Sequence, residues 1–351
     1  MSNDAGIDPR LVPTTTLADG TVLPMIGLGT FGSDHVPGPA VADAVRGAIR
    51  AGYRLIDCAA CYGNEALIGQ VLADLISSGE VAREDLRIIS KVWNDSHAPE
   101  AVAASARKSL TDLRLDRLDL YLVHWPFPNH HAPFASPEDR NPDSRPYLHE
   151  EFMATWRAME RLVDEGLVRA IGVSNVTIPK LDLVLRDARI APVVAEMELH
   201  PSFQQGELFQ YCLDHRIQPI GYSPLGSPAR PERDRTDDDV DDLSMDVVRA
   251  IAQEHGIHPA EVALKWAVQR GQIPIPFSAT PRNYLSNLRA VTTDPLTPAQ
   301  MDAMRSAERN CRLIKGQVFC WPGSAGWLDL WDVDGTIPGW HGYESHPPSG
   351  V

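Results

Sequence analysis

The sequence predicts an α/β protein folded as a closed (β/α)8 TIM barrel, and three observations support this class. Short β-rich segments alternate with amphipathic helical segments, which is typical of a parallel sheet. Eight such units fit the length of 351 residues. The G-x-G-x-x-G of "GLGTFG", residues 27–32, overlaps the first predicted strand and none follows a predicted strand, which disfavours the alternative, an open doubly wound sheet. We expect one domain over residues 1–351, with a core at about 14–310 and a C-terminal tail at 311–351.

Each predicted strand is a short run of apolar and β-branched residues. The strands are expected at residues 25–31, 53–58, 86–92, 118–125, 168–174, 192–199, 218–224 and 273–278. The segments between them carry apolar residues at spacings of three and four, the pattern of one buried helix face. Several of these segments end at a glycine, a common helix-stop residue. The clearest helices are expected at residues 41–52, 64–77, 99–114 and 150–166.

Four segments do not fit the repeat. "TTTLADGTVLPMIG" predicts an N-terminal β-hairpin that turns at Asp19-Gly20 and plugs the N-terminal end of the barrel. Long loops over residues 126–150 and 226–242 follow the fourth and seventh strands, and loops of this length are often functional. If the tail folds back, the tail and the two long loops all lie at the catalytic mouth. The tail contains Trp321, Trp327, Trp331 and Trp340.

The composition excludes several kinds of partner. The formal net charge of −15 disfavours nucleic acid or an anionic membrane as a partner. No apolar run approaches the ~20 residues that span a bilayer, and the N-terminus lacks an apolar signal core. We therefore expect a soluble, cytoplasmic protein that is a monomer or small homo-oligomer. Cys58 and Cys61 form a C-x-x-C motif without a second pair, so we interpret them as buried thiols and expect no metal site.

Polar residues stand at the carboxyl ends of the predicted strands, where (β/α)8 barrels place their chemistry. Taken singly, each has a structural explanation, such as a helix cap, a solvated lysine or a packed histidine. An acid, a cation, a phenol and an imidazole at one mouth together indicate catalysis. The set consists of Asp57, Lys91, His124, Ser174, Asn175, Glu196, Tyr222, Ser223 and Ser278, with Tyr62 in the turn after the second strand.

This set suits the protonation of a carbonyl oxygen while another group delivers hydride. A phenol with a pKa of about 10 is a poor acid or base at neutral pH, but a nearby ammonium lowers that pKa. Lys91 is expected to do this for Tyr62, with Asp57 holding the ammonium in place. A neutral His124 would donate a hydrogen bond that orients the carbonyl.

The motifs "DCAACYGNE", "ISKVWN", "LVHWP", "GVSN", "ELHP" and "GYSPLGS" occur in that order, and with them the chain resembles the aldo-keto reductases from "GLGTFG" to "LSNL". The resemblance implies that Tyr62 is the general acid/base, that Lys91 and Asp57 set its pKa, and that His124 orients the carbonyl. It also implies an extended nicotinamide dinucleotide across the barrel mouth.

The resemblance further implies individual cofactor contacts. Glu196 occupies a position where the family normally has Gln, and an ionised carboxylate can only accept hydrogen bonds, here from the carboxamide NH2. From the nicotinamide ribose through the carboxamide and ring to the pyrophosphate, the implied contacts are Thr30, Phe31, Asp57, Ser174, Asn175, Glu196, Tyr222, Ser223, Leu225 and Ser227.

The adenosine end departs from the family pattern. Phe277 replaces a lysine that would contact a 2′-phosphate, whereas Ser278, Arg282 and Asn287 fit. The remaining arginine can still bind phosphate, so NADP(H) is favoured, with NAD(H) as the alternative.

The expected activity is reversible NAD(P)H-dependent reduction of a small-molecule carbonyl compound: a sugar, polyol or aryl carbonyl contacted by Trp93, His124 and Trp125. Two other hypotheses remain open on the sequence. One is a non-catalytic nicotinamide-binding regulatory subunit on the same scaffold. The other is a (β/α)8 aldolase or isomerase that uses Lys91 as a Schiff base.

Overall fold

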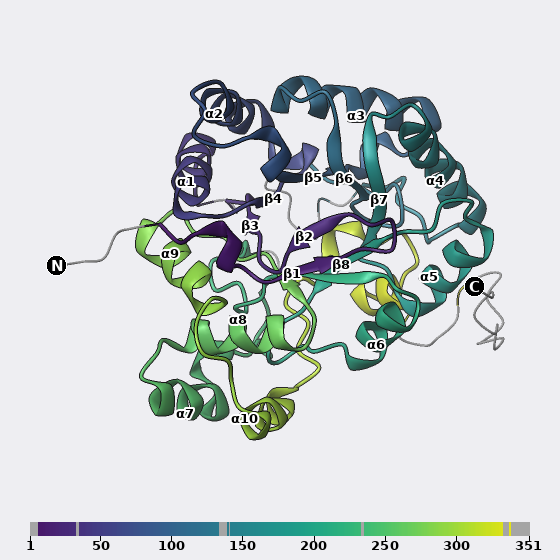
Figure 1. Ribbon diagram of the computed structural model, residues 1–351. Coiled ribbons are helices and arrows are strands. Elements are labelled where there is room, and N and C mark those ends of the chain that lie inside the picture. Colours follow the sequence, from purple (N-terminus) through teal and green to yellow (C-terminus); the bar gives the residue numbers. More distant parts are fainter. Residues whose placement is uncertain are drawn as a thin grey trace.

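A computed structural model describes residues 6–32, 35–132, 139, 141–232, 235–332 and 337 of the chain. Eight strands form one parallel sheet in chain order from β3 to β10, and helices surround it (Figure 1). The backbone N–H groups of Gly27 and Gly29 donate to the carbonyls of Pro274 and Pro276 at 3.0 and 3.1 Å. These bonds join the first strand segment to the last, so the sheet closes into the expected (β/α)8 barrel.

Every barrel strand lies inside a segment predicted to be a strand, because the apolar runs are buried on both sides as parallel strands require. Gly29 pairs with Asp57, and Ser174 with Glu196, so polar residues of neighbouring strands reach the same edge. The strands are β3 (Leu28–Gly29), β4 (Leu55–Asp57), β5 (Arg87–Val92), β6 (Leu118–Val123), β7 (Val168–Ser174), β8 (Val194–Glu198), β9 (Gln218–Tyr222) and β10 (Ile273–Pro274).

The helices form the outer layer, and the four clearest predictions coincide with α1 to α4. Gly52 ends α1 with φ of 121°, and its N–H donates to the carbonyls of Ala48 and Ile49. The helices are α1 (Gly38–Ala51), α2 (Glu65–Ser77), α3 (Pro99–Leu113), α4 (His149–Asp164), α5 (Ile178–Asp187), α6 (Gly206–Asp214), α7 (Asp246–His255), α8 (Pro259–Gln269), α9 (Pro281–Ala290) and α10 (Pro298–Ala303).

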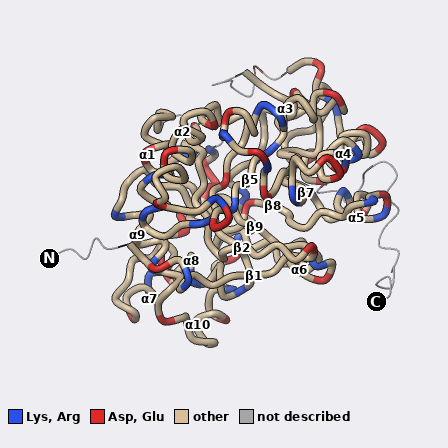
Figure 2. Tube along the Cα trace, turned by 45° about the horizontal axis from the view of Figure 1, so that its top comes forward, with Lys and Arg blue, Asp and Glu red and all other residues tan. Residues whose placement is uncertain are grey.

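Charged residues of both signs are distributed along the chain, with many on these outer helices (Figure 2). Among the residues that the structure describes, no helix combines the length and apolarity needed to cross a membrane.

The predicted N-terminal hairpin is present and closes one end of the barrel. Its strands β1 (Thr14–Thr16) and β2 (Val22–Pro24) pair antiparallel around a turn at Gly20, where φ is 83°. Leu17, Leu23 and Met25 are buried in one cluster with side chains from the barrel strands. The hairpin lies across the barrel end nearest the viewer in Figure 1. With this end filled by apolar side chains, a polar site is left to the opposite mouth.

The tail folds back against the barrel, which the sequence alone did not decide. Trp125 and Phe127, which follow β6, pack in one cluster with the tail residues Phe319, Leu330 and Trp331. Trp321 and Trp327 are partly buried against this cluster. The expectation for Trp340 lies outside the described residues, as do residues 133–138 and 140 of the first long loop.

Candidate active site

Lys91 is the centre of a buried charge cluster at the carboxyl ends of β4, β5 and β8. Its Nζ lies 2.6 and 2.7 Å from the two carboxylate oxygens of Asp57, and it donates to the Cys58 carbonyl at 3.1 Å. Glu196 Oε1 lies 3.3 Å from the same Nζ. Because burial disfavours charge, the ammonium is stable only through these carboxylates, which raise the pKa of Lys91 well above its usual range against the effect of burial.

Tyr62 lies above this cluster in the turn that follows β4. The Lys91 Nζ lies 5.3 Å from the centroid of the Tyr62 ring. Burial raises the Tyr62 pKa well above its ordinary value, the Lys91 ammonium opposes this, and Asp57 and Glu196 reinforce it. The Lys91 ammonium therefore lowers the Tyr62 pKa as expected, but burial outweighs its effect. The phenol is held protonated, the form that can donate a proton.

His124 follows β6 and faces Tyr62 with its ring edge, at 5.8 Å between ring centroids. Burial and the nearby Lys91 ammonium hold the pKa of His124 well below its usual value, so the imidazole is neutral. Its Nδ1 lies 3.6 Å from Cys61 Sγ. The interpretation of both cysteines as buried thiols holds for Cys58 but is wrong for Cys61, which is exposed toward the cavity.

A cavity of about 1430 Å³ runs across this mouth of the barrel. Most of the sequence-predicted site residues line it. Lys91 and Ser174 do not, because they are buried behind Asp57 and Asn175 at 0% and 1% exposure. The predicted residues that line it are Thr30, Phe31, Asp57, Tyr62, Trp93, His124, Trp125, Asn175, Glu196, Tyr222, Ser223, Leu225, Ser227, Ser278, Arg282 and Asn287.

Asn175 joins three of the strand ends beneath the cavity. Its backbone is left-handed, with φ of 56°, and its side-chain Nδ2 donates to the His124 carbonyl at 2.9 Å. The Tyr222 hydroxyl donates to Asn175 Oδ1 at 2.6 Å. These bonds fix the ring of Tyr222 relative to His124, and therefore fix one wall of the cavity relative to the other.

The opposite end of the cavity is lined by the start of α9 and by α8. Arg282 is exposed there, and Phe277 occupies the wall where the resemblance would have a lysine. Glu261 on α8 also lines this end, and its Oε1 accepts from Ser286 Oγ at 3.0 Å. Glu261 was not predictable as a site residue, because it belongs to a different helix from the adenosine motif.

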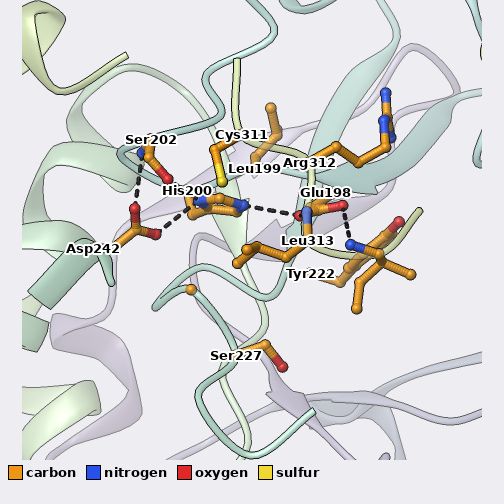
Figure 3. A network of polar contacts seen from close by, with 12 residues as sticks. Glu198, Leu199, His200, Ser202, Tyr222, Ser227, Asp242, Cys311, Arg312 and Leu313 are labelled. Atoms are coloured by element: carbon orange, nitrogen blue, oxygen red, sulfur yellow. Dashed lines mark hydrogen bonds and ion pairs between the residues drawn. The ribbon is translucent and has the colours of Figure 1, made fainter. Parts of the chain in front are cut away.

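The loop after β9 and the tail are joined by a second buried network, which the sequence did not predict (Figure 3). His200 contacts Glu198 Oε1 at 2.9 Å and Asp242 Oδ2 at 2.7 Å. The backbone N–H groups of Leu313 and Ile314 donate to Glu198 at 2.6 and 3.0 Å. Burial would lower the His200 pKa, but its bonds to Asp242 and Glu198 raise it to about 9.

A closed parallel barrel with a tyrosine, a neutral histidine and a lysine–carboxylate cluster beside one cavity is the arrangement that the resemblance to the aldo-keto reductases implies. The family model for the aldo/keto reductase family matches residues 25–309. An aldo/keto reductase of Synechocystis sp. is 41% identical over 321 residues, which cover 90% of this chain and 95% of that protein.

Aldo-keto reductase family 1 member A1 of Bos taurus is 42% identical over 299 residues, with 85% of this chain and 90% of that protein covered. The protein of that name from Homo sapiens is 41% identical over 300 residues, with the same coverage. The chain therefore belongs to the aldo/keto reductase family.

The family acts on small carbonyl compounds with nicotinamide cofactors, and this chain is an NAD(P)H-dependent oxidoreductase. The residues present fit such a cofactor. The cavity is continuous from Tyr62 to Arg282, so one bound molecule can contact both the phenol and the guanidinium. Between them, the buried Oε2 of Glu196 lacks a hydrogen-bond partner among the described residues.

Proposed function

We propose that this protein reversibly reduces an aldehyde or ketone to an alcohol, with Tyr62 donating the proton to the carbonyl oxygen. The observation that carries the proposal is the convergence of Tyr62, His124 and the Lys91–Asp57 pair at one end of the cavity. The bound nicotinamide cofactor would supply the hydride to the carbonyl carbon.

The protonation states of the site residues support this division of roles. His124 is neutral and therefore has one ring N–H to donate to a carbonyl oxygen without adding a charge. Tyr62 is protonated and lies beside that imidazole. As negative charge develops on the carbonyl oxygen, the nearby Lys91 ammonium stabilises it and favours transfer of the phenolic proton. Asp57 holds the ammonium in position for this.

Lys91 is poorly suited to the alternative role of Schiff-base nucleophile. A nucleophilic amine must be neutral and must reach the substrate. Lys91 is 0% exposed, does not line the cavity, and has its pKa raised by two carboxylates. The structure therefore favours carbonyl reduction over an aldolase or isomerase.

For the cofactor, we propose NADPH in preference to NADH. Arg282 is exposed at the adenosine end and is available to pair with a 2′-phosphate. The preference should be modest, because Phe277 removes the second cation and Glu261 places a carboxylate at the same end.

For the substrate, we propose an uncharged aryl carbonyl compound rather than a sugar or an aldehyde that carries a carboxylate. Beyond His124 the cavity wall is aromatic: Trp93 lies 5.9 Å from Phe319, and Trp125 lies 4.6 Å from it, between ring centroids. The described lining residues on this side include one charged side chain, that of Asp95. The negative charge of Asp95 would repel an anionic substrate.

The test is a comparison of matched aldehydes with both cofactors. NADPH and NADH are first titrated against the protein by fluorescence, and oxidation of the reduced cofactor is then followed with benzaldehyde, 4-carboxybenzaldehyde and D-xylose. We expect the highest kcat/KM with benzaldehyde and NADPH. Absence of turnover with every carbonyl, despite cofactor binding, would favour the regulatory-subunit hypothesis. Faster turnover of the carboxylate compound would reject the substrate class alone.

A further inference from the structure

Glu196 is a carboxyl group built into the cavity wall. Its side chain is 2% exposed and lines the cavity, and Oε1 lies 3.3 Å from Lys91 Nζ. Oε2 is buried and has no hydrogen-bond partner within the described residues. An unpaired buried polar atom is costly, so this oxygen is suited to accept a hydrogen bond from a ligand or to carry a proton.

The charged and titratable groups around Glu196 come from four elements. Asp57 on β4 and Lys91 on β5 contact it, and Tyr62 in the turn after β4 and Tyr222 on β9 also interact with its charge. The negative charge of an ionised Asp57 already balances the positive charge of Lys91. A charged Glu196 therefore gives this buried cluster one net negative charge, and a protonated Glu196 gives it none.

We propose that Glu196 sets the balance between the oxidised and reduced forms of the bound cofactor, because its ionised carboxylate stabilises the positively charged oxidised nicotinamide. This inference rests on the proposed function, which puts the nicotinamide at this end of the cavity. A glutamine at the same position has the same shape but cannot supply this charge. The chain would then favour alcohol oxidation increasingly as the pH rises.

The direction of this pH dependence follows from the linkage between proton binding at Glu196 and cofactor binding. Burial raises the pKa of Glu196 to about 8, with Asp57 adding to the effect and Lys91 opposing it. A cationic ring nearby lowers that pKa, whereas the neutral reduced ring does not. The oxidised cofactor therefore binds more tightly as pH rises toward about 8, where the gain levels off, and its binding releases a proton below that pH.

The experiment measures the dissociation constants of NADP⁺ and NADPH between pH 6 and pH 9. Both forms carry the same phosphates, so their ratio isolates the nicotinamide end. In the wild type, the affinity for NADP⁺ relative to NADPH should rise on the order of tenfold across this range. In Glu196→Gln the ratio should stay constant. Glu65→Gln is the matched control, because Glu65 is also buried but is bound by Ser90 and Ser109 away from the cavity.

Proton release gives a second measurement that does not depend on the Glu196 variant. In the Tyr62→Phe background, which removes the phenol, NADP⁺ binding at pH 7 should release protons into a weakly buffered solution, and NADPH binding should not. A constant ratio in the wild type, or an unchanged pH dependence in Glu196→Gln, would overturn the inference and leave the proposed function standing. Failure of the wild type to bind either cofactor would reject both.

Discussion

Lys91 and Asp57 form a buried two-point ion pair: Nζ lies 2.6 Å from Oδ1 and 2.7 Å from Oδ2. Adjacent parallel strands hold the two side chains, and both emerge at the same edge of the sheet. A buried pair of this kind contributes little net stability, but removing one partner leaves an uncompensated charge. Its geometry therefore constrains which substitutions the site tolerates.

Lys91→Met should lose carbonyl reduction and also destabilise the fold by about 3–5 kcal/mol, because the Asp57 carboxylate is left buried without a cation. Asp57→Asn in the same chain should restore part of that stability without restoring activity. Urea unfolding of the single and double variants, with kinetics on each, separates the two effects. Wild-type rates in Lys91→Met would contradict the proposed role.

Tyr62→Phe should keep the fold and bind the cofactor, yet reduce carbonyl compounds ~10²–10⁴-fold more slowly, the loss expected for a general acid. Tyr121→Phe is the control: this phenol is fully buried and donates to Ser105, outside the cavity. The measurement is single-turnover oxidation of NADPH with benzaldehyde. If the two variants had similar rates, Tyr62 would not be the proton donor.

Arg282→Ala should weaken NADPH binding and leave NADH binding almost unchanged. A charge-assisted contact is worth about 1.5–3 kcal/mol, and the exposure of Arg282 suggests the lower end, about tenfold in affinity. Phe277→Lys should tighten NADPH selectively, because it adds a second cation. Arg289→Ala, at the other end of α9, is the control. Equal losses for both cofactors in Arg282→Ala would mean that Arg282 binds no 2′-phosphate.

His200 predicts a pH dependence of stability. Its pKa is raised to about 9 in the folded protein, above the ~6.5 of an exposed histidine. Its stabilising contribution, about 3 kcal/mol, is therefore complete below pH ~6.5 and is lost as pH rises through about 9. His200→Gln should be much less stable than the wild type at pH 6 and only slightly less stable at pH 10. Thermal unfolding at both pH values tests this, and a constant difference would contradict it.

The sequence predicted the strands and the cluster of strand-end residues because both depend on local patterns. Apolar runs identify buried strands, and parallel strands bring Asp57, Lys91 and His124 to one edge whatever the loops do. The orientation of Cys61 was not predictable in this way, since Cys58 and Cys61 share one motif but face opposite environments. The net direction of the Tyr62 pKa depends on burial by surrounding segments, which spacing does not reveal.

The polar networks between distant segments were also not predictable from the sequence. "ELHP" contains Glu198 and His200, but their partners Asp242 and Leu313 lie far along the chain, in a short 3-10 helix and in the tail. No periodicity links them. The same holds for Glu261, which reaches the adenosine end from α8, next to the helix that carries the motif.

The bonds from Glu198 to the tail have a consequence for biosynthesis. Glu198 and Leu313 are separated by 115 residues in the chain, and Leu313 follows the last barrel strand, β10. A nascent chain on the ribosome therefore exposes all the strands before it exposes the groups that satisfy the Glu198 carboxylate. Until then, the Glu198 carboxylate has His200 beside it but needs water in place of the tail N–H groups. The mouth of the barrel is consequently the last part to mature, and a chain released prematurely before Leu313 would hold a closed sheet with a hydrated, unfinished rim.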